Sequence, residues 1–250
     1  MKPLQLGTRR ELFVDDYLIE SMQGGARQML HHPEAREIVL EHDHAWEGNT
    51  CGYHTFFRDG KIVRAYYRGS HHGKIHRDDA APQVTCMAQS DDGITWRKPT
   101  LGLFEHNGST VNNIILKGLG HHNFAPFRDT NPDCDPQQQY KALGGSKKEG
   151  GLFAFSSADG IHWKTAFDKP IITDGAFDSQ NLAFWDHQLK QYHAYYRDFR
   201  YGKIRDIKTA TSPDFEHWTS GQWLQYPDAP TEQLYTNQIL QYHRAPHLYI

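Results

Sequence analysis

Four acidic side chains lie beside segments that the sequence predicts to be β-strands. A carboxyl group can act as a general acid when it is held protonated, and as a base or nucleophile when it is ionised. Burial and neighbouring charges can separate two carboxyl groups in this way, so a group of them predicts acid–base chemistry. Acidic residues are also common in solvated loops, and that interpretation stays open for each one. The four candidates for catalysis are Glu47, Asp129, Asp178 and Glu232.

The pattern Ser-x-Asp-(Gly or Phe)-x-x-Trp occurs three times, at 90–96, 157–163 and 212–218. Repeats at such intervals point to propellers or other repeat arrays. Serine and aspartate side chains hydrogen-bond the backbone of turns, glycine accepts a positive φ, and the tryptophan can fasten the next strand. We therefore interpret the aspartates of this motif as turn residues rather than as catalytic groups.

A strand–turn–strand pattern precedes these turns. It runs through 53–68 and 182–197, which both end in Tyr-Tyr-Arg, with a third copy at 124–143 and a fourth that begins at 234. Each unit then predicts four antiparallel strands, which make one blade of a β-propeller. The predicted fold class is all-β, a five-bladed β-propeller of four-stranded antiparallel blades, in a single domain over residues 1–250.

The expected blades are blade 1 at about 47–117, blade 2 at about 120–175, blade 3 at about 177–226 and blade 4 from about 230. The chain ends inside a predicted strand, whereas closed propellers avoid unpaired edges. We therefore expect the N-terminal part of a longer propeller, truncated within blade 4. The alternative is a ring that is open or that a partner completes. Segment 11–19 predicts an outer strand that helps to close the ring.

Several of these motifs resemble the five-bladed β-propeller glycoside hydrolases, the superfamily of families 32, 43, 62, 68 and 117, which is also similar to family 130. The similar segments are Phe127-Arg128-Asp129, Trp46-Glu47, the Tyr-Tyr-Arg strands and the Ser-x-Asp turns. The resemblance implies an enzyme that cleaves glycosidic bonds in oligosaccharides or polysaccharides. It also implies a nucleophile or base on blade 1, an acidic residue that tunes pKa values on blade 2 and a general-acid glutamate on blade 3.

The four acidic candidates fit this family pattern unequally. Asp129 matches the blade 2 position best. Glu47 is the well-placed acidic residue of blade 1, where the family has aspartate. Asp178 stands on blade 3 in place of the expected glutamate, and Glu232 on blade 4 is the competing acid. A separation of about 5–5.5 Å between the two reacting carboxyl groups would imply retention of configuration, and about 6.5–9.5 Å would imply inversion.

A sugar presents apolar faces and hydroxyl edges, which suit aromatic, amide and imidazole side chains. Arg128 can in addition contact a carboxylate or sulfate. The expected substrate-binding residues are His54, His122, Asn123, Arg128, Asn181, Tyr235 and Asn237.

No metal ion and no cofactor are expected, because adjacent histidines such as His71 and His72 would face opposite sides of a strand. The aromatic residues Phe56, Trp185 and Tyr196 are expected to pack between blades.

The composition excludes several classes of protein. With 27 Lys and Arg against 30 Asp and Glu, the net charge of −3 gives no electrostatic footprint for nucleic acid or anionic lipid. No stretch approaches the roughly 18 apolar residues of a membrane span. The three cysteines lack a Cys-x-x-Cys pair, which argues against a disulfide framework or a structural zinc site. The first ten residues lack a signal-peptide core, so a cytoplasmic protein is expected unless a leader has been removed.

The expected partner is a carbohydrate substrate, with no nucleic acid and no membrane, and the sequence indicates no particular oligomeric state. The alternative function is a non-catalytic propeller that binds a carbohydrate or a protein. This alternative stays open because the acidic residues of blades 1 and 3 depart from the family pattern.

Overall fold

The computed structural model describes residues 4–72 and 83–250, and the chain divides into two compact units. The larger unit covers 39–239 and contains every strand of the structure's described part. The smaller unit combines the N-terminal residues up to Ile38 with 240–250.

Helix in the described residues is confined to two short 3₁₀ turns, η1 (Pro136–Gln138) and η2 (Lys147–Glu149). No helix in this part of the chain is long and apolar enough to cross a membrane.

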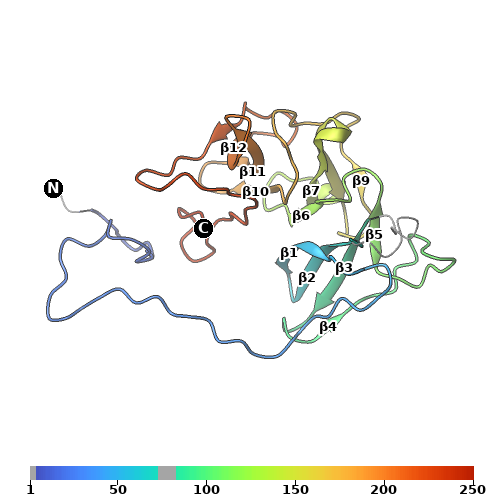
Figure 1. The fold of residues 1–250 in the computed structure, drawn as a ribbon, viewed down its shortest axis with the longest axis horizontal. Coiled ribbons are helices and arrows are strands. Elements are labelled where there is room, and N and C mark those ends of the chain that lie inside the picture. The colour runs from blue at the N-terminus through green and yellow to red at the C-terminus, as the bar shows by residue number, and fades with distance from the viewer. Residues whose placement is uncertain (1–3, 73–82) are drawn as a thin grey trace. The chain divides into compact units, whose positions relative to one another are not determined.

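Three antiparallel sheets make up the larger unit (Figure 1). The first contains β1 (Gly52–Asp59), β2 (Ile62–Gly69), β3 (Val84–Ser90), β4 (Trp96–Arg97) and β5 (Ile114–Lys117). The second contains β6 (Ala125–Arg128), β7 (Tyr140–Ser146), β8 (Gly151–Ser157) and β9 (Lys164–Thr165). The third contains β10 (Leu182–Asp186), β11 (Gln191–Arg200), β12 (Ile204–Ser212) and β13 (Gln222–Trp223). In each sheet four successive strands pair in chain order, which confirms the all-β class and the four-stranded antiparallel sheets.

The first sheet has a fifth strand because two strands share one edge of β3. β4 pairs with the end of β3 at Gln89 and Ser90, whereas β5 pairs with its beginning, from Val84 to Cys86. Between them the backbone N–H of Met87 donates to the carbonyl of Asn113 at 3.0 Å. The outer edge of β3 is therefore paired along most of its length.

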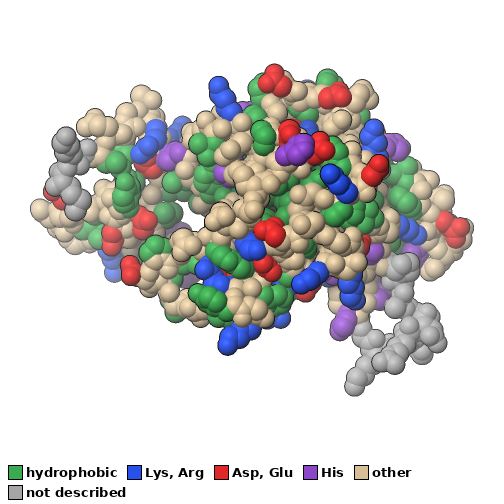
Figure 2. Space-filling model, turned by 90° about the horizontal axis from the view of Figure 1, so that it is seen from above, with side chains coloured by type: hydrophobic (Ala, Val, Ile, Leu, Met, Phe, Trp, Pro, Cys, Tyr) green, Lys and Arg blue, Asp and Glu red, His purple; other side chains and the backbone are tan. Residues whose placement is uncertain are grey.

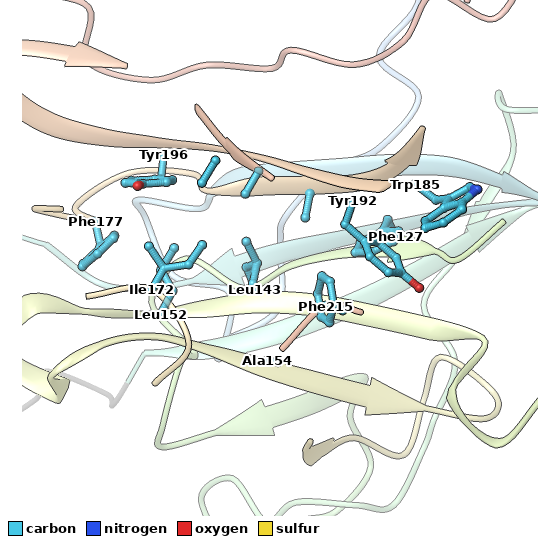
Figure 3. Close-up of a cluster of buried hydrophobic side chains, with 13 residues drawn as sticks. Phe127, Leu143, Leu152, Ala154, Ile172, Phe177, Trp185, Tyr192, Tyr196 and Phe215 are labelled. Atoms are coloured by element: carbon cyan, nitrogen blue, oxygen red, sulfur yellow. The ribbon is translucent and has the colours of Figure 1, made fainter. Parts of the chain in front are cut away.

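The sheets stack face to face through layers of buried aromatic and aliphatic side chains. Tyr66, Met87, Phe124 and Phe155 belong to a cluster between the first and second sheets. A second cluster lies between the second and third sheets, and Figure 3 shows Phe177 and Tyr196 at one end of it and Trp185, Tyr192, Phe127 and Phe215 at the other. Successive side chains of a strand point to opposite faces, so the second sheet contributes one face to each of these two clusters.

The three Ser-x-Asp turns form the local hydrogen bonds that the motif predicts. In the second turn the Ser157 hydroxyl accepts from the N–H of Gly160 at 2.9 Å, and Asp159 accepts from the N–H groups of Ile161 and His162. The Trp163 indole donates back to the Gly160 carbonyl at 3.1 Å. The turns at 90–96 and 212–218 repeat the same set of bonds, so these residues fold the turn.

The third turn has phenylalanine where the other two have glycine. Phe215 adopts φ of +68°, a conformation that costs a residue with a side chain free energy. Its ring is 2% exposed and packs against Tyr192 and Trp218 in the layer between the second and third sheets. Burial of the ring offsets the backbone cost.

Two expected strands are not formed. Residues 11–19 contain turns and irregular backbone, so the outer strand predicted there is wrong. The described residues after 230 contain an isolated bridge between Gln241 and Tyr249 but no sheet, and the three sheets do not close into a ring. Five blades and a truncation within blade 4 stay predictions. Phe56 is 49% exposed rather than packed between sheets, whereas Trp185 and Tyr196 are buried as expected.

The smaller unit is held by turns and a few polar contacts. Glu11 contacts Arg9 and lies 3.0 Å from Nε2 of His247. Backbone bonds join Leu240 to Ile250 and Tyr242 to Leu248.

Figure 2 shows Lys and Arg side chains interspersed with Asp and Glu on the face that it draws, as the small net charge of −3 suggests.

The Ser-x-Asp turns should contribute to stability in proportion to the bonds of their aspartate. We expect Asp159→Ala to lower the Tm by a few degrees, because a lost hydrogen bond is worth about 1 kcal/mol and each kcal/mol shifts the Tm of a domain this large by about 2–4 °C. Asp159→Asn, which keeps an acceptor, should lower it less. Thermal denaturation followed by circular dichroism measures both, with Asp168→Ala at an exposed position as the control.

The effect of Asp159→Ala on the Tm should depend on pH. Burial opposes ionisation of Asp159, but hydrogen bonds from His162 and the Ile161 N–H lower its pKa below the ordinary value. The stabilisation by the Asp159 carboxylate is therefore complete above the unfolded-state pKa of about 3.9. It is lost as the pH falls through the lower pKa that Asp159 has in the folded state. The difference in Tm between wild type and Asp159→Ala should be constant above about pH 5 and shrink below about pH 4. A difference that grew on acidification would contradict this account.

Candidate functional site

The starts of the three inner strands, β1, β6 and β10, are tied together by side-chain amides. Gln180, just before β10, donates to the carbonyl of His54 at 2.9 Å and to the hydroxyl of Thr55 at 2.7 Å in β1. Asn123, just before β6, donates to the carbonyl of Phe177 at 2.5 Å. These bonds bring the beginnings of the three sheets to one place.

A group of aromatic, basic and acidic side chains gathers at this place, which we call the axial cluster. Asp178 is its carboxylate: Oδ2 lies 3.2 Å from Nη2 of Arg197, and Oδ1 lies 3.5 Å from Nε2 of His122. The members of the axial cluster are Tyr53, Arg68, His122, Asp178, Arg197 and Tyr235.

Irregular backbone directs two parts of this cluster. β1 carries a bulge between Gly52 and Thr55, and Tyr53 within it has φ of +54°. A bulge re-aims the side chains of a strand, and here the Tyr53 hydroxyl lies 3.2 Å from that of Tyr235. Phe177, which directly precedes Asp178, has φ of +59° and is completely buried. Strained non-glycine backbone of this kind concentrates at functional sites.

The two arginines occupy the same position of the repeated Tyr-Tyr-Arg strands. Each reaches a segment beyond its own sheet: Arg68 lies 3.4 Å from Nδ1 of His122, ahead of β6, and Arg197 lies over the ring of Tyr235, after β13. Arg197 is 2% exposed, and its Nε and Nη1 have no hydrogen-bond partner among the described residues. These two donors are enclosed by protein, and Nη2 is the part of the guanidinium that reaches Asp178.

The environment sets the protonation of two members of the cluster. Burial and then the charge of Arg68 lower the pKa of His122, so its imidazole is neutral at neutral pH. Burial and the hydrogen bond with Tyr235 raise the pKa of Tyr53 to about 12, which keeps its hydroxyl protonated. Both groups can therefore offer a neutral hydrogen-bonding edge to a bound molecule.

A cavity of about 670 Å³ opens beside the axial cluster. It contains a second carboxylate, Glu149 of η2, whose oxygens accept from the N–H of Gly120 at 3.0 Å and the hydroxyl of Ser146 at 2.6 Å. Glu149 was not a candidate from the sequence, because it lies in the turn between the second and third strands of its sheet. The cavity is lined by Gln83, His121, His122, Ser146, Lys147, Lys148, Glu149, Ala176 and Asp178.

Of the four acidic residues predicted from the sequence, only Asp178 is among the described residues that line this cavity. Glu47 is fully buried elsewhere: it accepts from Tyr67 at 2.5 Å, from Lys98 at 2.8 Å and from the N–H of His44 at 2.9 Å. Burial opposes its ionisation, but these bonds and His42 lower its pKa to about 2. Glu47 therefore stays ionised inside its own network.

Asp129 follows the far end of β6, away from Asp178. Its buried carboxylate forms an ion pair with Lys141 and accepts from the Tyr192 hydroxyl at 2.7 Å. Its other oxygen accepts from the N–H of Asn131 at 2.9 Å. The structure thus gives Asp129 partners that join the second and third sheets.

Glu232 and Arg128 also lie outside the cavity beside the cluster. Glu232 is exposed and lines a different cavity of about 340 Å³, next to the hairpin of β11 and β12. Arg128 is 44% exposed and lies 3.4 Å from Asp59 at the β1–β2 turn.

The predicted substrate-binding residues divide into two groups. His122 and Tyr235 belong to the axial cluster, whereas His54 lies on the other side of β1, with Nε2 2.9 Å from that of His42. The three asparagines are buried and bind backbone: Asn123 also bonds Gly145, Asn181 bonds Ser179 and Phe177, and Asn237 bonds Gln180 and Tyr195. Their amides position the segments that carry the cluster.

Sequence reasoning missed Tyr53, Arg68, Arg197 and Glu149. A signal for the arginines was present, because both end a Tyr-Tyr-Arg strand at equivalent places of two repeats. Tyr53 follows from a bulge that nothing in the local pattern announces.

No protein-family model matches this chain, and no curated protein matches it. Solved structures do match. A glycoside hydrolase family 32 β-fructofuranosidase from Bombyx mori is 13% identical, with a TM-score of 0.51, and the match covers 77% of this chain and 41% of that chain. A fructofuranosidase from Schwanniomyces occidentalis complexed with fructosylnystose is 14% identical, with a TM-score of 0.50, over 74% and 36% of the two chains. A protein described as a glycoside hydrolase is 16% identical, with a TM-score of 0.44, over 75% and 58%.

This chain spans less than two thirds of the length of each of these matched chains. At such identities the similarity concerns the fold. The chain has a β-propeller-type fold similar to that of the two fructofuranosidases, which confirms in fold the resemblance that the motifs indicated.

The amide of Asn123 should be essential for holding the segment before Asp178. We expect Asn123→Ala to destabilise the protein by about 1–3 kcal/mol, because the buried carbonyls of Gly145 and Phe177 and the N–H of Gly145 lose their partner. Urea denaturation measures the change, and Gln188→Ala in the exposed β10–β11 turn is the control. Equal free energies of unfolding for Asn123→Ala and wild type would show that these bonds do not stabilise the folded protein.

Proposed function

We propose that this chain carries a glycosidase-type site in which a carbohydrate binds beside the axial cluster and Asp178 and Glu149 act as the paired carboxylates. The observation that carries the proposal is that both carboxylates line one cavity at the starts of the inner strands. The fold, similar to that of two fructofuranosidases, supports it as an analogy.

The proposed chemistry needs two carboxyl groups on either side of a glycosidic bond. One protonates the oxygen of the leaving sugar, while the other attacks the anomeric carbon or removes a proton from the attacking water. Asp178 is 58% exposed and can reach a ligand, and Arg197 beside it holds the carboxylate in place. Glu149 belongs to the second sheet, in the turn that joins β7 to β8, and lines the same cavity.

The other members of the axial cluster suit a polyhydroxylated ligand. Neutral His122 and the hydroxyls of Tyr53 and Tyr235 can exchange hydrogen bonds with sugar hydroxyls. Arg197 orients Asp178 from behind, with Nη2 3.2 Å from Oδ2, and Arg68 lies over the ring of Tyr53 at 4.4 Å.

Release of sugar from a panel of aryl glycosides and polysaccharides tests this function. Asp178→Asn and Glu149→Gln should each lower kcat by about 10²–10⁴-fold, which is the usual contribution of an acid–base group. Asp168→Asn, at an exposed position outside the cavity, is the matched control and should keep the wild-type rate.

Asp129→Asn separates this proposal from the site that the family resemblance implies. Because Asp129 is enclosed by Lys141 and Tyr192, its variant should lose stability while the folded fraction keeps its rate. Full activity of both Asp178→Asn and Glu149→Gln, with loss of activity in folded Asp129→Asn, would reject the assignment.

A second candidate function is carbohydrate binding without hydrolysis. It is favoured by the bonds of Glu149, whose two oxygens already accept from Gly120 and Ser146. In that case calorimetry would detect a glycan that is bound but released unchanged, and Asp178→Asn would weaken binding rather than turnover.

A further inference from the structure

Two histidines and a cysteine outside the axial cluster point their ligand atoms at one another. The ligand atoms of His42, Cys51 and His54 all lie within 4.8 Å of one another. The Nε2 atoms of the two imidazoles are 2.9 Å apart. His42 comes from the segment before β1, Cys51 directly precedes that strand and His54 lies within it, so the cluster joins two parts of the chain.

We infer that His42, Cys51 and His54 form a zinc-binding site. Zinc binds histidine nitrogen at about 2.0–2.1 Å and cysteine sulfur at about 2.3 Å in a tetrahedron, which sets the ligand atoms roughly 3.3–3.7 Å apart. The two Nε2 atoms are 2.9 Å apart and no pair of ligand atoms exceeds 4.8 Å, so adjustments of the three side chains can bring their ligand atoms onto one ion. The fourth position is left to water.

The donor set selects the class of metal. Two imidazoles and one thiolate suit zinc and similar borderline ions, whereas calcium and magnesium require oxygen ligands. The thiol of Cys51 is free, as is that of Cys134, so neither forms a disulfide.

Groups around the three ligands provide the outer contacts that such a site needs. Metal-bound histidines usually direct their second ring nitrogen at a carboxylate, which fixes the ring. Here Nδ1 of His42 is buried without a hydrogen-bond partner and lies 3.6 Å from Oε1 of Glu47. The ring of Tyr67 packs against both imidazoles, with centroids 4.4 Å from His42 and 5.6 Å from His54. The buried carboxylate of Glu47, which already accepts from Tyr67 and Lys98, thus lies next to the second ring nitrogen of His42.

The spacing Cys51-x-x-His54 is a metal-ligand spacing that differs from the Cys-x-x-Cys pair of common zinc sites. The absence of such a pair and the adjacent histidines gave no indication of this cluster, because His42 joins it only in the folded chain. The site is independent of the proposed function, because none of its ligands lines the cavity beside Asp178. Its effect would be to tie the segment from Leu40 to Trp46 onto the face of the first sheet, where both residues pack.

Metal binding to the full chain, first stripped with a chelator, tests the inference. Titration with Zn²⁺ should give one equivalent bound and a rise in Tm. Co²⁺ should give a thiolate-to-cobalt charge-transfer band and the intense visible absorption of tetrahedral coordination.

Variants assign the ligands. Cys51→Ser should abolish the charge-transfer band, and His54→Gln should weaken Zn²⁺ binding by more than the about 10–100-fold that loss of an outer contact costs. Cys134→Ser, the matched control, should keep both the band and the affinity, because Cys134 lies beside Lys141 and Asp129. Circular dichroism confirms that each variant is folded.

A measurement on the wild-type chain covers the case in which a variant does not fold. Zn²⁺ should protect Cys51 from alkylation, as read by peptide mapping, while Cys134 reacts at the same rate with and without the ion. Absence of the cobalt band, an unchanged band in folded Cys51→Ser, or alkylation of Cys51 unaffected by Zn²⁺ would each overturn the inference.

Discussion

The buried amide of Asn123 is the contact on which the candidate site depends. It joins the carbonyl of Gly145 in the second sheet to the carbonyl of Phe177, which belongs to the segment leading into the third. Phe177 holds a left-handed backbone conformation directly before Asp178, so bonds to main-chain atoms place the Asp178 backbone, and Arg197 and His122 then contact its carboxylate. The chemistry of the cluster thus rests on a residue that never contacts the cavity.

Alternation along β2 explains how one strand serves two separate groups of side chains. Tyr66 and Arg68 face the second sheet, where the Tyr66 hydroxyl donates to the Gly160 carbonyl at 2.9 Å and Arg68 reaches His122. Tyr67 faces the opposite side and contacts Glu47 and the two histidines. A shift of one residue in the pairing of β1 with β2 would exchange the two faces of the strand. The regular pairing from Thr55 onward, which follows the bulge in β1, therefore determines both groups of contacts.

The features that could be predicted from the sequence are those whose interactions are local. The Ser-x-Asp turns close their hydrogen bonds within seven residues, as Ser157 and Trp163 show, and the hairpins join neighbouring strands. The partners that a side chain contacts across the fold do not follow from its neighbours in the sequence. Asp129 and Asp178 both adjoin inner strands, but they lie at opposite ends of them, and only pairing across sheets decides this. Tyr53 and His54 are neighbours in sequence and lie on different sides of β1, as strand alternation dictates, but contacts across the fold decide that Tyr53 meets Tyr235 and His54 meets His42.

The shared edge of β3 has a consequence for how the protein meets other molecules. An exposed, continuous strand edge is a template on which another chain can add a strand and begin to aggregate. Here β4 and β5 together occupy the edge of β3, and the edge strands β9 and β13 are two residues long. The outer edges of the three sheets therefore offer little uninterrupted strand for backbone pairing, and the longer edge strands β1 and β10 belong to the opposite edges, where the sheets meet.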